Sequence, residues 1–122
     1  MRKRLLSLLF LSLYGSMLFA QEPLDINDVE RVPLGDFTYQ WRNIYDRTPL
    51  HGKCRIILSY RSYTIAHFNK DGILDGLYEK YEDNHLVQKL TYVKGILRGK
   101  GYEYYTDGTV KKECVWNEQG KI

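Results

Sequence analysis

Aromatic and glycine residues recur at one spacing through three successive segments of this 122-residue chain. The segments read FNKDGILDGLYEKYEDNHLVQKLT (68–91), YVKGILRGKGYEYYTDGTVKKECV (92–115) and WNEQGKI (116–122). Phe68, Tyr92 and Trp116 begin them and stand 24 residues apart, and the same interval separates Tyr78 from Tyr102, Tyr81 from Tyr105 and Leu86 from Val110. A fixed period of this length indicates one copied unit, and it predicts an array in which each unit packs on its neighbour.

Each unit has the pattern of a β-hairpin. In the returning segment 86–92, Leu90 and Tyr92 fall on one side and the charged Lys89 on the other, as in a strand with one packed and one wet face. Turns are expected at Asp83-Asn84 and at Asp107-Gly108, which is a strong signal for a two-residue hairpin loop. The chain shows no helical period after residue 20. We therefore expect an all-β protein, an elongated single sheet of about seven antiparallel strands built from hairpin repeats of about 24 residues.

The array begins before residue 68. From Phe37 the chain alternates, with Phe37, Tyr39 and Trp41 on one side, which predicts a strand with an aromatic face. The segment 45–52 then matches 92–99 in length. Residues 37–122 are thus the predicted hairpin-repeat domain. The polar stretch 21–36 has no sustained period, and we expect it to be a poorly structured N-terminal arm.

The first twenty residues have the pattern of a secretory signal peptide. Arg2, Lys3 and Arg4 precede an apolar run that ends at the small residue Ala20. Cleavage there predicts export from a bacterium, to the periplasm or beyond the cell, with no stable membrane insertion afterwards. A retained N-terminal anchor helix is the alternative, although the run is short for a membrane span.

Removal of that segment changes the charge. Three of the 18 basic residues lie within it and none of the 15 acidic ones does, which leaves 15 of each sign. A neutral chain offers no general electrostatic attraction for nucleic acid or for an anionic membrane, so we expect neither as a partner.

The two cysteines are not expected to pair, although an exported chain is where disulfides persist. Cys54 falls on an outgoing strand and Cys114 on a returning strand two units later. In a simple meander they are separated by five strand spacings, or roughly 24 Å, whereas a disulfide needs Cα atoms within about 7 Å. We expect half-buried thiols, and a measured intramolecular disulfide would mean that the sheet closes on itself or that the strand order differs.

The glycine and tyrosine spacing resembles the MORN-variant repeats of bacterial proteins. The pattern is G-x-L-x-G, then one or two residues, then Y-x-x-Y, and its two good copies are carried by Gly72, Leu74, Gly76, Tyr78 and Tyr81, and by Gly95, Leu97, Gly99, Tyr102 and Tyr105. Leu50 and Gly52 begin a weaker copy that has Cys54 in place of a tyrosine. The resemblance covers about residues 45–122, and it implies a β-hairpin array used for binding or as a scaffold. Some members of the family are antitoxin components, so an antitoxin-like inhibitor is one function that the resemblance implies.

No residue pattern points to catalysis, a cofactor or a metal. By their place in the units, His51, His67 and His85 fall on a connection, a returning strand and a turn, so they should not converge on an ion. The carboxylates mostly occupy turns or alternate with tyrosines, and no phosphate-binding loop, nucleophile elbow or zinc motif is present. We interpret the chain as a non-enzyme without cofactor or metal.

Tyrosines are the residues most suited to contact a ligand. Their simplest role is cross-strand packing within the sheet. If they are partly exposed, they form an amphipathic platform for a partner protein or a sugar ring. The leading hypothesis is an exported protein-interaction or scaffold module, with a homodimer through a free sheet edge as one form of it. The alternative is a carbohydrate-binding protein of the cell envelope. The predicted contact surface comprises Tyr78, Tyr81, Tyr102, Tyr104 and Tyr105.

Overall fold

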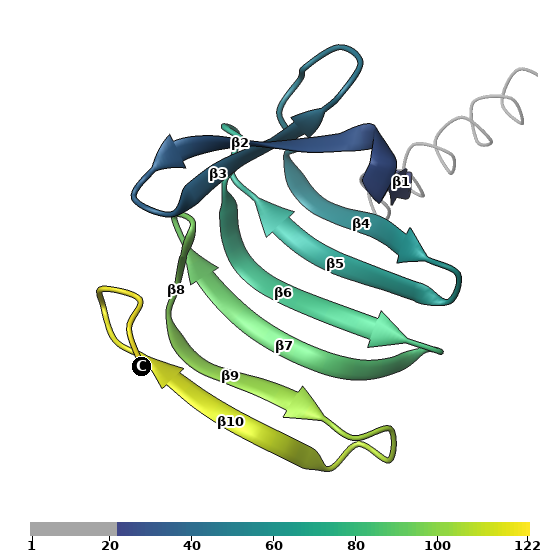
Figure 1. Ribbon diagram of the computed structural model, residues 1–122, viewed down its shortest axis with the longest axis vertical. Coiled ribbons are helices and arrows are strands. Elements are labelled where there is room, and N and C mark those ends of the chain that lie inside the picture. Colours follow the sequence, from purple (N-terminus) through teal and green to yellow (C-terminus); the bar gives the residue numbers. More distant parts are fainter. Residues whose placement is uncertain (1–21) are drawn as a thin grey trace, which may run out of the picture.

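The computed structural model describes residues 22–122 and is almost entirely β-structure (Figure 1). The predicted signal peptide lies outside the described residues. One 3-10 turn, η1 (Ile26–Asp28), interrupts the strands. The strands are β1 (Leu24–Asp25), β2 (Val29–Gly35), β3 (Thr38–Asn43), β4 (Gly52–Ser59), β5 (Ser62–Phe68), β6 (Leu74–Glu82), β7 (His85–Val93), β8 (Ile96–Leu97), β9 (Gly99–Tyr104) and β10 (Val110–Trp116).

The larger sheet follows the expected meander. Its order is β1-β4-β5-β6-β7-β9-β10, and β8 adds a short pairing to β7. From β4 to β10 all neighbours are antiparallel and joined by short connections. The all-β prediction is confirmed. The expectation of one purely antiparallel sheet is wrong in two respects, because β1 pairs with β4 in parallel and because β2 and β3 form a separate two-stranded sheet.

Residues 24–35 are ordered, which corrects the prediction of a poorly structured arm. The side chain of Asp25 accepts a hydrogen bond from the Asn27 backbone N–H at 2.8 Å and so caps η1. β2 then pairs with β3 over almost its whole length, from Val29 opposite Asn43 to Gly35 opposite Thr38. β1 has two residues and η1 has three, too few to leave a period in the sequence, and Pro33 and Gly35 interrupt the pattern of β2.

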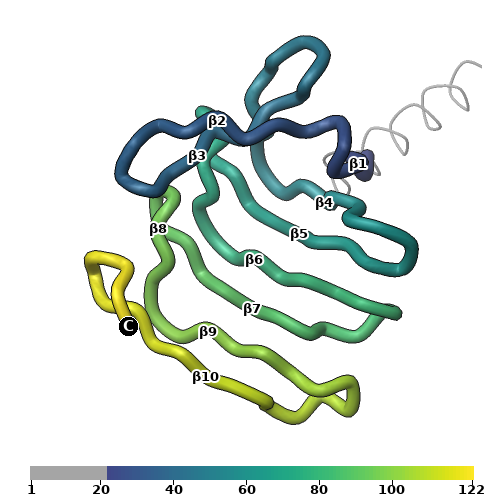
Figure 2. Tube along the Cα trace, in the orientation of Figure 1, coloured from purple at the N-terminus to yellow at the C-terminus, as the bar shows by residue number. Residues whose placement is uncertain are grey.

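The buried core lies at one end of the large sheet. Its six buried hydrophobic residues all fall between Leu50 and Leu74, on or beside β4, β5 and the start of β6. The β2–β3 hairpin covers them, with the Trp41 and Phe68 rings 5.5 Å apart. Within residues 22–122, strands β7, β9 and β10 contribute no buried hydrophobic side chain. The sheet therefore continues as a single layer beyond its core, as the tube in Figure 2 makes plain.

Two faces of the large sheet can now be defined. The inner face carries Cys54, Ala66 and Phe68 and is the one that the β2–β3 hairpin covers. The opposite face is the outer face. Phe68, Tyr92 and Trp116 all point inward, and the strand register sets each opposite a glycine, at Gly52, Gly76 and Gly99 respectively.

The β2–β3 hairpin is fixed to the connections between the strands. The Trp41 N–H donates to the Gly72 carbonyl at 2.7 Å, and the Gln40 amide donates to the Asp71 carbonyl at 3.0 Å. A Cβ at Gly72 would lie 2.5 Å from the Trp41 carbonyl oxygen, so only glycine allows this approach. The hairpin is thereby held across the end of the sheet where residues 69–73 connect β5 to β6.

The β9–β10 turn is longer than predicted. Asp107-Gly108 does not form a two-residue loop, because strand pairing stops at Tyr104 and Val110 and leaves residues 105–109 between them. The Asp107 carboxylate accepts hydrogen bonds from the N–H and the hydroxyl of Thr109, at 2.9 and 2.6 Å, and these bonds lower the pKa of Asp107. The side chain thus stabilises a wider loop.

Cys54 and Cys114 lie on β4 and β10, five strand positions apart in the order of the sheet. That separation, roughly 24 Å along the sheet, is too large for a disulfide. Cys54 is buried in the core, and burial raises the pKa of its thiol, which disfavours the reactive thiolate.

Candidate functional site

The five predicted tyrosines do not form one surface. Tyr78 lies directly opposite Ala66 and Leu90 and so points to the inner face. Tyr81 is opposite Tyr63 on the outer face, where Tyr102 and Tyr104 also lie. Tyr105 belongs to the loop after β9. Gly99 follows Tyr92 by seven residues, whereas Gly76 follows Phe68 by eight, so Gly101, opposite Cys114, takes the position that the 24-residue spacing assigned to Tyr102.

Each of these rings already contacts another side chain. Tyr81 stacks on Tyr63 at 5.0 Å, with the Arg55 guanidinium 4.2 Å from the centre of the Tyr63 ring. Tyr102 and Tyr104 stack on each other at 5.9 Å. The Tyr78 ring meets Tyr92 edge-on at 5.9 Å, and the Lys111 ammonium lies 5.9 Å from the centre of Tyr105. Packing of side chains within and between strands in this way stabilises a sheet that has little core.

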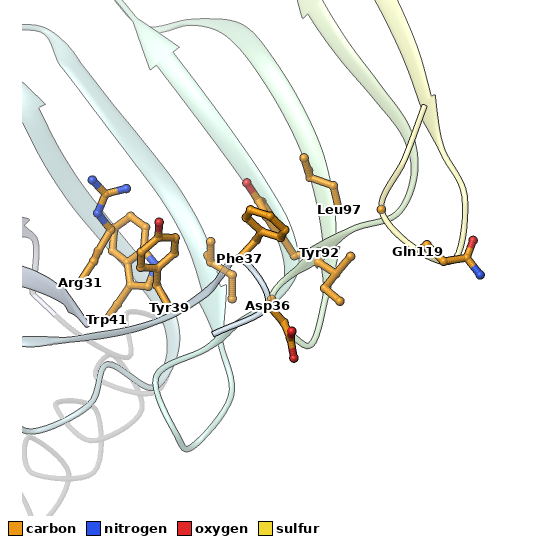
Figure 3. Close-up of a pocket in the computed structure, with 12 residues that line it drawn as sticks. Arg31, Asp36, Phe37, Tyr39, Trp41, Tyr92, Leu97 and Gln119 are labelled. Carbon is orange, nitrogen blue, oxygen red and sulfur yellow. The ribbon is translucent and has the colours of Figure 1, made fainter. Parts of the chain in front are cut away.

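A pocket of about 350 Å³ opens beside the β2–β3 hairpin (Figure 3). The hairpin supplies one wall through Arg31, Phe37 and Tyr39, and the other wall comes from Tyr92 and Leu97. The C-terminal loop closes the far end through Gln119 and Gly120. The pocket thus joins three parts of the chain that are distant in sequence, and its size is typical of ligand clefts.

Phe37 is the most exposed large hydrophobic residue of the described chain. Its side chain is 96% exposed at the tip of the β2–β3 hairpin, where Asp36 and Phe37 form a two-residue loop between the paired Gly35 and Thr38. Both loop residues have left-handed backbone angles, with φ of 50° at Asp36 and 64° at Phe37. Such loops favour Asn and Gly, because a β-carbon is strained in this conformation.

The sequence placed Phe37 on the aromatic face of a strand, and this prediction is wrong. β3 begins at Thr38, and Phe37 is a turn residue. The Asp-Phe pair lacks the glycine that usually follows Asp in a two-residue hairpin loop, so the turn was not recognised from the sequence. The pocket likewise could not be predicted, because it depends on the placement of β2, which the sequence did not reveal as a strand.

Arg31 presents a fixed positive charge at the rim of the pocket. Its guanidinium lies 5.7 Å from the ring centre of Tyr39 and 5.5 Å from that of Trp41. Within the described chain, no carboxylate lies within ion-pair distance of it, whereas Arg42 of the same hairpin binds Glu30 at 2.6 Å. Rings that hold the flat faces of a guanidinium leave its N–H edges available to a carboxylate.

The described residues contain no group of three or more side chains suited to hold a metal ion. His51 precedes β4, His67 lies on β5 with its Nδ1 at 3.0 Å from the Leu77 carbonyl oxygen, and His85 begins β7. None of the helical structure in residues 22–122 is long and apolar enough to cross a membrane.

Comparison of the chain with the models of known protein families, with characterised proteins and with solved structures finds no match.

Proposed function

We propose that this chain is a non-catalytic protein-interaction module whose contact surface is the Phe37 pocket, defined as Phe37 together with the pocket beside it. A partner protein packs against the Phe37 ring and the apolar wall formed by Tyr92 and Leu97, and Arg31 binds a carboxylate at the rim. The proposal retains the exported location that residues 1–20 predict.

The observation that carries the proposal is the combination of exposure and backbone strain at Phe37. A fully solvated phenyl ring contributes almost nothing to folding, and a non-glycine residue at φ 64° costs about 1–2 kcal/mol. A position that is unfavourable on both counts is typical of residues kept for a function. Exposed aromatic anchors beside a cleft are the residues that dominate the energy of protein interfaces.

A protein partner suits this surface better than a glycan. Sugar platforms use aromatic ring faces that are open to solvent and flanked by hydrogen-bonding groups. The tyrosines that the sequence singled out each contact another side chain already, and Phe37 has no polar group of its own. A phenyl ring that projects from the surface is instead a shape that a pocket on another protein accepts.

The test is affinity capture with three baits. Wild-type chain, Phe37→Gly and Tyr60→Ala are immobilised, exposed to an extract of the cells that produce the chain, and crosslinked before washing. Tyr60 is the matched control, because it is also an aromatic residue at a hairpin tip and is 87% exposed. We expect the wild-type and Tyr60→Ala baits to retain one and the same protein, and Phe37→Gly to lose it by at least about 100-fold, as for an interface hot spot.

Glycine fits the left-handed conformation at position 37, so loss of capture by Phe37→Gly is not explained by unfolding. Equal capture by all three baits, or capture of nothing by the wild-type chain, would contradict the proposal.

A further inference from the structure

The Phe37 pocket places a projecting group and a cavity side by side. The Phe37 ring is 96% exposed, so it does not fill the pocket that its own residue borders. A cavity of about 150 Å³ is enough to hold benzene, and this pocket has about 350 Å³. One copy of the chain therefore carries both a phenyl group and a space that accepts one.

Charge on the same surface is self-complementary. Arg31 and Asp36 both border the pocket and lie five residues apart along β2 and its turn, or roughly 16 Å in an extended strand. Among the described residues, neither has an ion-pair partner. A two-fold axis through the pocket that sets two hairpins antiparallel would bring Arg31 of each copy to Asp36 of the other.

We infer, on the basis of the proposed function, that the partner at the Phe37 pocket is a second copy of this chain. The Asp36-Phe37 turn of each copy docks on the other, with the phenyl ring against the apolar wall of Tyr92 and Leu97 and the carboxylate on the Arg31 guanidinium. Because the projecting group and the cavity belong to one patch, the contact is isologous and closes as a dimer.

A charge exchange tests this geometry directly. In Arg31→Glu the introduced carboxylate of each copy would face Asp36 of the other, and in Asp36→Lys the introduced ammonium would face Arg31, so each variant alone should be monomeric. In an equimolar mixture the introduced carboxylate of one variant faces the introduced ammonium of the other at one end of the contact, and the unchanged Arg31 and Asp36 face each other at the other end, so both ends are attractive. Sedimentation equilibrium of the full chain should show a wild-type dimer, monomers for each variant alone, and a dimer in the mixture, with a dissociation constant at least about tenfold below that of either variant alone.

Two further chains complete the experiment. Phe37→Gly should be monomeric, and Tyr60→Ala should dimerise like the wild type. Circular dichroism of every variant verifies the β-structure before sedimentation.

A monomeric wild-type chain at about 100 µM, a dimer that survives Phe37→Gly, or a mixture no tighter than its components would overturn the inference. The sedimentation experiment and the capture experiment can fail independently of each other. A monomeric wild type whose capture of another protein still depends on Phe37 would refute only the dimer, whereas capture independent of Phe37 would refute the proposed function itself.

Discussion

Phe37 combines a left-handed backbone with almost complete exposure to solvent, and the proposed function accounts for both. Its neighbour in the loop, Asp36, also has a left-handed backbone, yet Asp tolerates that conformation better than a bulky aromatic residue does. Nothing within the described chain covers the Phe37 ring, since the side chain is 96% exposed, so burial of the ring does not offset the backbone strain. The unfavourable energy is local to one turn, and the remainder of the hairpin is well paired.

The strain at Phe37 has a measurable consequence for stability. Phe37→Gly should raise the free energy of unfolding by about 1 kcal/mol, because glycine adopts a positive φ without strain and this gain exceeds its larger chain entropy in the unfolded state. Phe37→Ala is the control, since alanine removes the ring and keeps the strain. Urea unfolding at low protein concentration measures both. Equal free energies of unfolding for the two variants would show that the turn is not strained.

The tyrosines show that spacing in the sequence does not suffice to predict which residues share one face of the sheet. The sequence correctly placed Tyr78 and Tyr81 on one strand, but they are three residues apart, and residues at that spacing face opposite sides of a strand. Burial, with a smaller contribution from Glu79, raises the pKa of Tyr81. The role of these residues as packing groups follows from cross-strand contacts that only the register of β5 and β6 reveals.

At the scale of elements, the β2–β3 hairpin contributes most to the Phe37 pocket. It covers the core with Trp41, presents Arg31 to the pocket, and carries the Phe37 turn at its tip. The strand β3 could be predicted because Tyr39 and Trp41 alternate with polar residues. Its partner β2 could not, because Pro33 and Gly35 disrupt the pattern and because the pairing depends on residues that show no period of their own.

The contact that fixes this hairpin depends on Gly72. Gly72→Ala should lower the free energy of unfolding by about 3 kcal/mol, because the new Cβ meets the Trp41 carbonyl oxygen at 2.5 Å, the hydrogen bond from the Trp41 N–H is weakened, and φ is +77°. Gly108→Ala is the matched control. Its φ is +91° and nothing lies within 4 Å of the added Cβ, so it should cost only about 1 kcal/mol.

Thermal or urea unfolding of the two alanine variants measures this difference. If both glycines tolerate alanine equally well, the hairpin is not held against the 69–73 connection as described.

For the whole molecule, the main feature is a sheet that extends well beyond its core. The meander of strands from β4 to β10 was predictable from alternation and turn residues, and the all-β class is confirmed. The position of the core was not predictable. Phe68, Tyr92 and Trp116 have the same place in the sequence pattern, yet only Phe68 is buried, because only that end of the sheet lies under the hairpin.

This distribution predicts a gradient of local stability. Amide hydrogens of β4, β5 and the start of β6 should exchange only on global unfolding, because buried side chains surround them. Those of β9 and β10 should exchange at least about tenfold faster through local opening. Hydrogen–deuterium exchange read by NMR resolves the strands separately. Uniform protection from β4 to β10 would mean that the single layer is as stable as the covered part.

The claim on which the functional account rests is that Phe37 is retained for contact with another protein chain. Its most direct measurement is the amount of protein that an immobilised Phe37→Gly chain retains, relative to wild type, under conditions in which both are folded. We predict that the variant loses nearly all of the captured protein while it is at least as stable as the wild-type chain. Undiminished capture by a stable Phe37→Gly chain would contradict the account.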